Sequence, residues 1–256
     1  MRAWVVGVTA GLAIGWAGAG WTVTAQEAFQ AGSAALTVGD ATQAAQAFRE
    51  ALRLNPKLPA AWRGLGIALG RQGQWAAAAE AQAQATTLQP NYAAGWVMRG
   101  WAVHKTGQHG EAIRFLQRAA HLDPQNLEAY NALGVVYLFA DRPRPAEAST
   151  RQALRLDPQN GTAYYNLGLS LDRQGRFAEA VAAQSQAQRF EPRNPHPLLA
   201  QAVSYLALHQ RPQAEAAFQA AGRLQARYQT RAGLQTLTEA GFSQAQIQRL
   251  AVIGRP

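Results

Sequence analysis

The chain has 256 residues, no cysteine and a formal net charge of +9, with 24 lysines and arginines against 15 aspartates and glutamates. The lack of cysteine excludes disulfide bonds, cysteine-based zinc sites and lipid attachment through an N-terminal cysteine. The positive charge favours acidic partners, namely acidic peptides, anionic membranes or nucleic acids, and composition does not choose among them.

The N-terminus has the pattern of an export segment. After Met1 and Arg2, residues 3–23 carry no charged side chain, and Val23-Thr24-Ala25 has the small-residue spacing of a signal peptidase site. Because this stretch exceeds the usual apolar core of about 7–15 residues and approaches the ~20 that span a bilayer, an uncleaved anchor is the alternative to the cleaved signal that the Ala25 site favours. We therefore predict that residues 1–25 are a signal peptide or an N-terminal membrane anchor attached through residues 3–23. Either one predicts an exported protein, periplasmic or on the extracytoplasmic face of the membrane.

The remainder of the chain repeats with a period of 34 residues. Five prolines mark that period: Pro56, Pro90, Pro124, Pro158 and Pro192. Two columns of the aligned units are always alanine: Ala44, Ala78, Ala112, Ala146, Ala180 and Ala214, and Ala51, Ala85, Ala119, Ala153, Ala187 and Ala221. A period of this length is typical of a helical hairpin that is stacked many times, each unit covering the apolar face of its neighbour.

Small and turn-forming residues define each hairpin. Two antiparallel helices approach closely only where one presents glycine or alanine, so we expect Gly66 to face Ala78. Four glycines at the fifteenth position should form the turn between the two helices: Gly39, Gly73, Gly107 and Gly175. Three asparagines two residues after a proline should cap the next helix: Asn126, Asn160 and Asn194.

These columns resemble the tetratricopeptide repeat, whose pattern is matched by Trp62, Leu65, Gly66, Ala78, Ala85 and Pro90. The resemblance covers six units, at 25–58, 59–92, 93–126, 127–160, 161–194 and 195–228, within a repeat domain of residues 26–228. The fourth unit departs from the pattern, with Asp141 in place of the turn glycine and with Pro143 and Pro145 beside it. Since proline is tolerated in a first helical turn, Pro145 should begin a helix instead of breaking one. The resemblance implies an all-α, right-handed α-solenoid.

Residues 229–256 leave the repeat and should form C-terminal capping helices. Apolar residues from Leu234 to Ile253 follow helical spacing, with Gly241 as a stop and Ser243 as a cap. The turn Ala240-Gly241-Phe242-Ser243 resembles a helix-turn-helix junction, which would suggest DNA binding. We favour the interpretation as a cap over the end of the solenoid.

The resemblance also implies a binding groove lined by the first helix of each unit. The groove positions hold Arg63, Ile67, Arg71, Val97, Trp101, His104, Lys105, Asn131, Phe139, Tyr165 and Arg173, together with Leu138 and Asp172. Such a basic and aromatic groove predicts a protein or acidic peptide partner, because arginine pairs with carboxylates and aromatic rings provide large contact areas. The function that follows is a non-enzymatic interaction scaffold in envelope assembly, secretion or complex maturation. The alternative is a basic α-solenoid that binds nucleic acid.

No catalytic, metal or cofactor site is expected. The chain lacks phosphate-binding loops and nucleophile-elbow motifs, and His104 and His109 are five residues apart across a turn, on different helices. The carboxylate clamp of chaperone-binding repeats is also not expected, since Ile67, Met98 and Glu128 occupy positions where that clamp needs asparagine or lysine.

Overall fold

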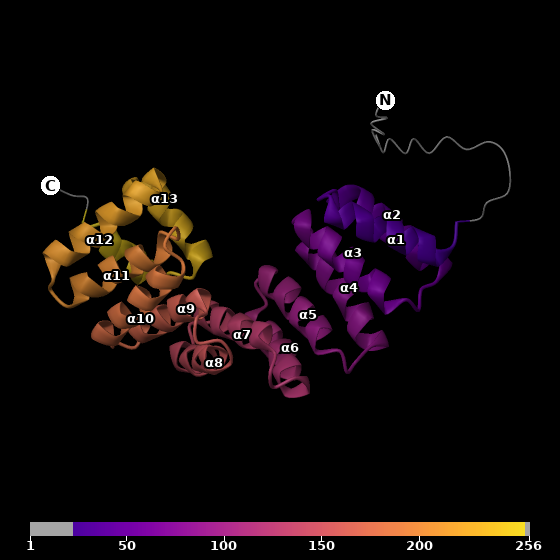
Figure 1. The fold of residues 1–256 in the computed structure, drawn as a ribbon, viewed down its shortest axis with the longest axis horizontal. Coiled ribbons are helices and arrows are strands. Elements are labelled where there is room, and N and C mark those ends of the chain that lie inside the picture. Colours follow the sequence, from indigo (N-terminus) through magenta and orange to yellow (C-terminus); the bar gives the residue numbers. More distant parts are fainter. Residues whose placement is uncertain (1–22, 254–256) are drawn as a thin grey trace, which may run out of the picture.

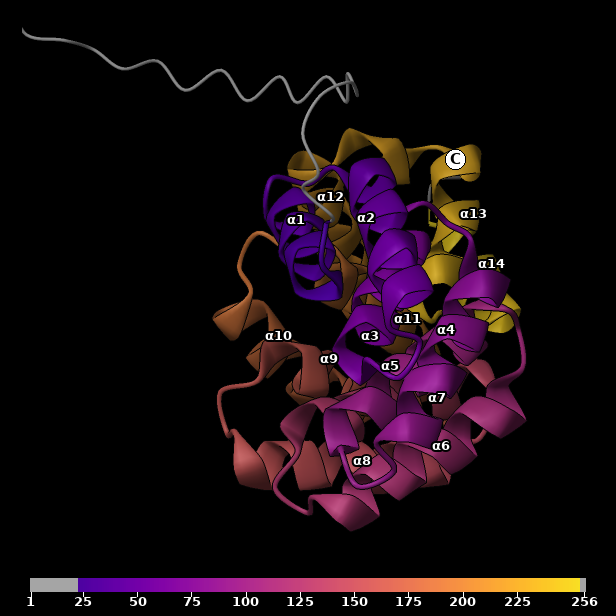
Figure 2. The same cartoon turned by 90° about the vertical axis from the view of Figure 1, so that its right-hand side faces the viewer.

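The computed structural model describes residues 23–253, and every regular element in that range is a helix. The predicted signal or anchor lies outside this range except for its last residues. Six hairpins follow one another along the chain: α1 (Ala25–Thr37) with α2 (Ala41–Leu54), α3 (Pro59–Arg71) with α4 (Trp75–Leu88), α5 (Ala93–Lys105) with α6 (His109–Leu122), α7 (Leu127–Phe139) with α8 (Pro143–Leu156), α9 (Gly161–Arg173) with α10 (Phe177–Phe190), and α11 (His196–Ala207) with α12 (Arg211–Leu224). The hairpins stack along a curved path, so the chain is a right-handed α-solenoid, as predicted (Figures 1 and 2).

The small-residue columns hold the hairpins together. Every member of the two alanine columns is at most 2% exposed. The side chain nearest to Gly66 is that of Gln82, one turn beyond Ala78, which a Cβ at Gly66 would meet. Gly100 repeats this arrangement, and a Cβ there would come within 2.7 Å of Cγ of the fully buried Leu116. The glycine column therefore makes room for a larger side chain of the second helix, whose size varies from unit to unit.

The turns within the hairpins use the left-handed backbone conformation. Gly39, Gly73, Gly107 and Gly175 have φ between 73° and 86°, which confirms the predicted turns. In the fourth and sixth hairpins Asp141 and His209 take their place, with φ of 52° and 58°. The fourth turn leads directly into α8, and the helix begins at Pro143 and continues through Pro145 without a break.

The junctions between hairpins are closed by side-chain bonds. Asn126 and Asn160 accept hydrogen bonds from the Ala129 and Ala163 N–H groups, as predicted. The prediction for Asn194 is wrong, because α11 begins only at His196 and the Asn194 side chain accepts from the His196 N–H in a local turn.

Tryptophan side chains close two of these junctions. Trp62 and Trp96 donate their indole N–H to the carbonyls of Pro56 and Pro90, at 2.9 and 2.8 Å. The large ring that opens a repeat is thus bonded to the proline position that ends the one before it.

A compact cap follows the sixth hairpin. It consists of η1 (Ala226–Gln229), α13 (Arg231–Gln235), η2 (Thr236–Ala240) and α14 (Gln244–Leu250). Gly241, with φ 86°, ends η2, and Ser243 caps α14 in a reciprocal bond pair with Gln246. The apolar side chains that hold the cap to the repeats are all buried: Leu234, Leu237, Phe242, Ile247 and Leu250. In residues 23–253 no helix is both long and apolar enough to cross a membrane.

Candidate functional site

The first helices of the hairpins form one continuous wall. Each contacts the next, from α1 and α3 through to α9 and α11. The predicted groove residues all lie on α3, α5, α7 and α9 of this wall.

The cap covers the α9 part of the wall. The Tyr165 hydroxyl donates to the Ala240 carbonyl at 2.6 Å, and Arg173 donates to the carbonyls of Leu138 and Gly241. The prediction that Tyr165 and Arg173 line a free groove is therefore wrong. These side chains bind a segment of their own chain that lies some seventy residues further along.

A buried carboxylate fixes the same segment. Asp172, on α9, accepts hydrogen bonds from Ser204 of α11 and Gln246 of α14, both at 2.8 Å, and forms an ion pair with Arg249 at 3.4 Å. Tyr165 is buried where it meets the cap. This burial raises the pKa of the Tyr165 hydroxyl well above its ordinary value, so the hydroxyl stays protonated and acts as a donor.

Two more predicted groove residues lie in the core. Val97 is fully buried and His104 is 5% exposed, because α7 packs over this part of α5. The Phe139 ring meets the His104 imidazole edge-on, with ring centroids 4.8 Å apart. Burial, helped by His109 and Lys105, lowers the pKa of His104 to about 4.

His104 and His109 lie on different helices, as predicted, yet their rings meet across the turn. Their Nδ1 atoms are 3.0 Å apart, so one neutral ring can donate to the other. Within residues 23–253, no group of three or more histidine, aspartate or glutamate side chains is placed to hold a metal ion.

The wall is open between α3 and α5, where a cavity of about 260 Å³ lies over α4. Its lining includes three predicted residues, Ile67, Arg71 and Trp101. It also includes Trp75 and Met98, which the sequence analysis missed. Gly66 and Gly70 also line it, and a Cβ on either would meet a side chain of α4, Gln82 or Trp75. The four-residue spacing of these two glycines on an inner helix is the sequence feature that could have indicated this cavity.

Cations border this cavity. Arg71 is exposed and donates to the Leu36 carbonyl at 2.7 Å, and Lys105 is exposed, with its ammonium 5.9 Å from the Trp75 ring centre. Arg63 lies over the Tyr92 ring and donates to Gln89 at 2.7 Å. Helices α3 and α5 contain no aspartate or glutamate. We name the surface formed by Arg63, Ile67, Arg71, Trp75, Met98, Trp101 and Lys105 the α3–α5 surface.

Asn131 and Phe139 lie between the open and the covered parts of the wall. Both are half-buried, and the Asn131 Oδ1 atom is buried with no hydrogen-bond donor among the described residues. Phe139 lines a cavity of about 290 Å³ together with Arg173, Gly241 and Phe242. Phe139 therefore lies at the edge of the cap, beside Gly241 and Phe242.

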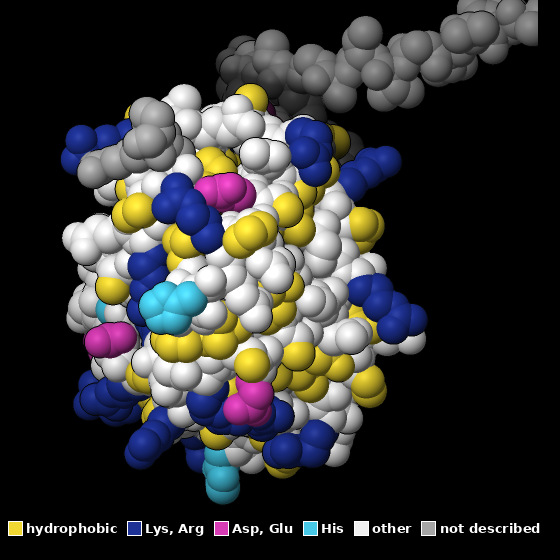
Figure 3. Space-filling view, turned by 90° about the vertical axis from the view of Figure 1, so that its left-hand side faces the viewer, with side chains coloured by type: hydrophobic (Ala, Val, Ile, Leu, Met, Phe, Trp, Pro, Cys, Tyr) yellow, Lys and Arg dark blue, Asp and Glu magenta, His cyan; other side chains and the backbone are white. Residues whose placement is uncertain are grey.

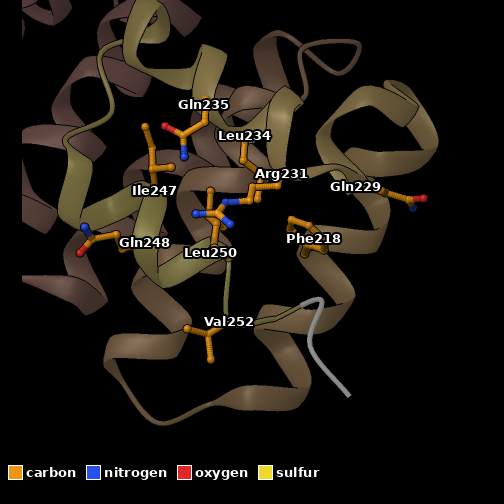
Figure 4. A pocket seen from close by; sticks show the side chains of 10 residues that line it. Phe218, Gln229, Arg231, Leu234, Gln235, Ile247, Gln248, Leu250 and Val252 are labelled. Carbon is orange, nitrogen blue, oxygen red and sulfur yellow. The ribbon is translucent and has the colours of Figure 1, made fainter.

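The outer side of the cap holds a separate cavity of about 470 Å³ (Figure 4). Phe218, Leu234, Ile247 and Leu250 line it, and the Arg231 side chain extends toward Leu250. Lysine and arginine side chains surround this end of the molecule and gather along its lower rim (Figure 3). Hydrophobic side chains lie between these cations over much of the same face (Figure 3).

The repeat pattern can be compared with known families. The family model described as tetratricopeptide repeat matches residues 29–93, 65–126 and 131–195, which together make up more than half of the chain. The chain belongs to the tetratricopeptide repeat family. No protein of curated function matches it in sequence comparison.

Solved structures share the fold of this tetratricopeptide repeat protein. A tetratricopeptide repeat protein from Parabacteroides merdae is 16% identical, with a TM-score of 0.69 over 90% of this chain and 98% of that chain. YrrB, titled a TPR protein with an unusual peptide-binding site, is 19% identical, with a TM-score of 0.57 over 71% and 94%. The APC/C hetero-tetramer Cut9–Hcn1 is 20% identical, with a TM-score of 0.67 over 79% of this chain and 40% of that chain. This chain thus corresponds to less than half of the matched Cut9–Hcn1 chain.

Proposed function

We propose that the α3–α5 surface binds a protein segment in which acidic residues flank a bulky apolar side chain. Membership in the tetratricopeptide repeat family supports a scaffold for protein–protein interaction. The proposal of this particular ligand rests on the apolar cavity between α3 and α5. Cations border this cavity, and the two helices contain no carboxylates. We further propose that the protein performs no catalysis, as is general for scaffolds of this family.

The chemistry of the surface selects the ligand. Trp75, Trp101, Ile67 and Met98 offer an apolar cavity for one large side chain. Arg71 beside it offers a guanidinium that pairs with carboxylates. Tryptophan and arginine are also the residues that most often dominate binding energy at interfaces. The peptide-binding site named for YrrB belongs to that protein, and it supports the idea that this fold can hold a peptide.

Peptide selection tests this proposal. Random dodecapeptides displayed on phage are selected on the full chain, and the enriched peptides are synthesised for fluorescence anisotropy. We expect them to combine aspartate or glutamate with an aromatic or aliphatic residue. Trp101→Ala should weaken their binding roughly 30-fold, about 2 kcal/mol. Arg71→Ala with Lys105→Ala should weaken it roughly tenfold and reduce its salt dependence.

The matched control removes two exposed arginines elsewhere, Arg49→Ala with Arg223→Ala, and should leave affinity within about twofold. Equal affinity of wild type and the Arg71/Lys105 variant for the selected peptides would place the binding surface elsewhere. Enrichment of peptides without acidic residues would contradict the proposed ligand. Nucleic acid is not proposed as a ligand, because no described feature favours it over an acidic peptide.

We also propose that the protein acts outside the cytoplasm, with residues 1–25 retained as an anchor. What supports retention is Thr24, whose hydroxyl caps α1 by accepting from the Glu27 N–H, while Glu27 accepts from the Thr24 N–H. Cleavage after Ala25 would remove this capping box, which stabilises a helix by about 1 kcal/mol. N-terminal sequencing of the protein from fractionated cells should find residue 1 or 2 in the membrane fraction. A product that begins at Gln26 in the soluble periplasm would contradict retention.

A further inference from the structure

The fourth hairpin turn, where the repeat pattern is broken, borders a basic cavity. A space of about 530 Å³ lies between this turn and the next one along the solenoid. Six residues that line it are Arg142, Pro143, Arg144, Pro145, Arg173 and Arg176. This site is separate from the α3–α5 surface, because it lies on the turns that lead into α8 and α10.

Two of the four arginines have no carboxylate partner. Arg176 is held by Glu147 at 2.8 Å and by Glu179 at 2.6 Å. Arg142 and Arg144 are exposed, and neither forms an ion pair or a side-chain hydrogen bond within residues 23–253. The cavity therefore carries an excess of about two positive charges from side chains that are free to bind an anion.

Arg173 forms the buried side of this cavity. Its side chain is 9% exposed, and its terminal nitrogens donate to the carbonyls of Leu138 and Gly241. Asp141, its closest carboxylate, is 3.8 Å away and mostly exposed. The Nε–H group of Arg173 is buried and has no acceptor among the described residues. This buried Nε–H group is shielded from the cavity, so Arg173 contributes positive charge to the cavity wall and not a further accessible donor.

The two prolines determine how an anion would be held. Pro143 and Pro145 have no backbone N–H, so the first turn of α8 offers few of the donors with which helix N-termini usually bind phosphate. Recognition then depends on guanidinium groups, whose planar pairs of N–H donors match the oxygens of phosphate.

We propose that this cavity binds a phosphate dianion, either free or as a phosphate monoester. The two unpaired charges of Arg142 and Arg144 match the charge of such a group, and the guanidinium of Arg173 adds positive charge at the buried side of the cavity. This inference goes beyond the proposed function, since it concerns another ligand and another face of the solenoid.

Isothermal titration of the full chain with inorganic phosphate in chloride buffer tests the proposal. We expect saturable binding with one site, and at least a tenfold weaker affinity for Arg142→Ala with Arg144→Ala. Both side chains are exposed and unbonded, so this variant should keep the helical circular dichroism of the wild type. The matched control, Arg114→Ala with Arg118→Ala, removes the same charge from exposed positions of α6 and should bind phosphate like the wild type. No saturable binding by the wild type, or equal losses in the two variants, would overturn the proposal.

Two further arms distinguish the sources of the phosphate group. Glycerol 3-phosphate presents it on a soluble molecule, and phosphatidylcholine vesicles that contain phosphatidic acid present it on a lipid surface. A site for a phosphate monoester should bind at least one of these probes, and the Arg142/Arg144 variant should lose that binding. Binding to acidic peptides but not to phosphate, glycerol 3-phosphate or these vesicles would contradict a phosphate site. Neither result depends on the α3–α5 surface.

Discussion

Replacing Asp172 with alanine should lower the free energy of unfolding by about 3 kcal/mol and loosen the C-terminal cap. This carboxylate is buried and joins three helices through Ser204, Gln246 and Arg249. Its removal leaves the buried Gln246 amide without an acceptor, and it breaks an ion pair that is only partly exposed. Urea denaturation measures the loss in stability, and hydrogen exchange of residues 236–250 shows whether the cap has loosened.

The control for this experiment is Glu239→Ala, which removes an exposed carboxylate from the cap and should change stability by less than about 0.5 kcal/mol. If Asp172→Ala unfolds like the wild type, with unchanged exchange in the cap, then the carboxylate does not hold the cap against α9. The free energy of unfolding of Asp172→Asn should lie between those of the wild type and of Asp172→Ala, because an amide oxygen can still accept from Gln246 or Ser204.

Acidification from about pH 6.5 to about pH 4 should destabilise the protein by up to about 3 kcal/mol through His104 alone. In the folded state its pKa is lowered to about 4, mainly by burial, whereas in the unfolded chain it should be near 6.5. The unfolded state therefore binds more protons in this interval. The stability is fully present above pH 6.5 and is lost as the pH falls to about 4. Burial also lowers the pKa of His196, which adds to the effect in the same direction.

Chemical denaturation at several pH values checks this prediction. His104→Phe keeps an aromatic ring against Phe139 and should give a shallower decline in stability between pH 6.5 and 4 than the wild type. His121→Gln, at an exposed position of the next helix, should leave the slope unchanged. An identical slope for wild type and His104→Phe would show that His104 does not titrate in this way.

Much of the fold could be predicted because its causes are local and repeated. The alanine columns, the turn glycines and the caps at Asn126 and Asn160 each act within one hairpin, and their recurrence every 34 residues makes the pattern recognisable in the sequence. The break at Asp141 and Pro143 was equally visible in the sequence.

The candidate site could be predicted only in part. Ile67, Arg71 and Trp101, which the repeat positions place in the groove, do line one cavity. Tyr165 and Arg173 occupy equivalent positions, yet the contact that covers them comes from a non-repeating segment about seventy residues away. The repeat alignment also did not predict Trp75 as a cavity residue. Trp75 reaches the cavity from α4 because Gly70 has no side chain, and a Cβ on Gly70 would come within 2.9 Å of the Trp75 ring. Such contacts depend on packing between residues that are distant in the sequence or that differ in size from one repeat to the next. A repeat alignment does not show this packing.

The chain's own cap covers the inner wall at α9 and leaves the α3–α5 surface open. Hydrogen exchange of the free, full-length protein tests this claim most directly, with the amides of α14 followed by mass spectrometry. We predict that these amides are protected nearly as strongly as those of α9 and α11, and that Asp172→Ala removes most of that protection. Rapid exchange throughout α14 in the wild type would contradict this arrangement, because Tyr165 and Arg173 would then be free to bind a partner.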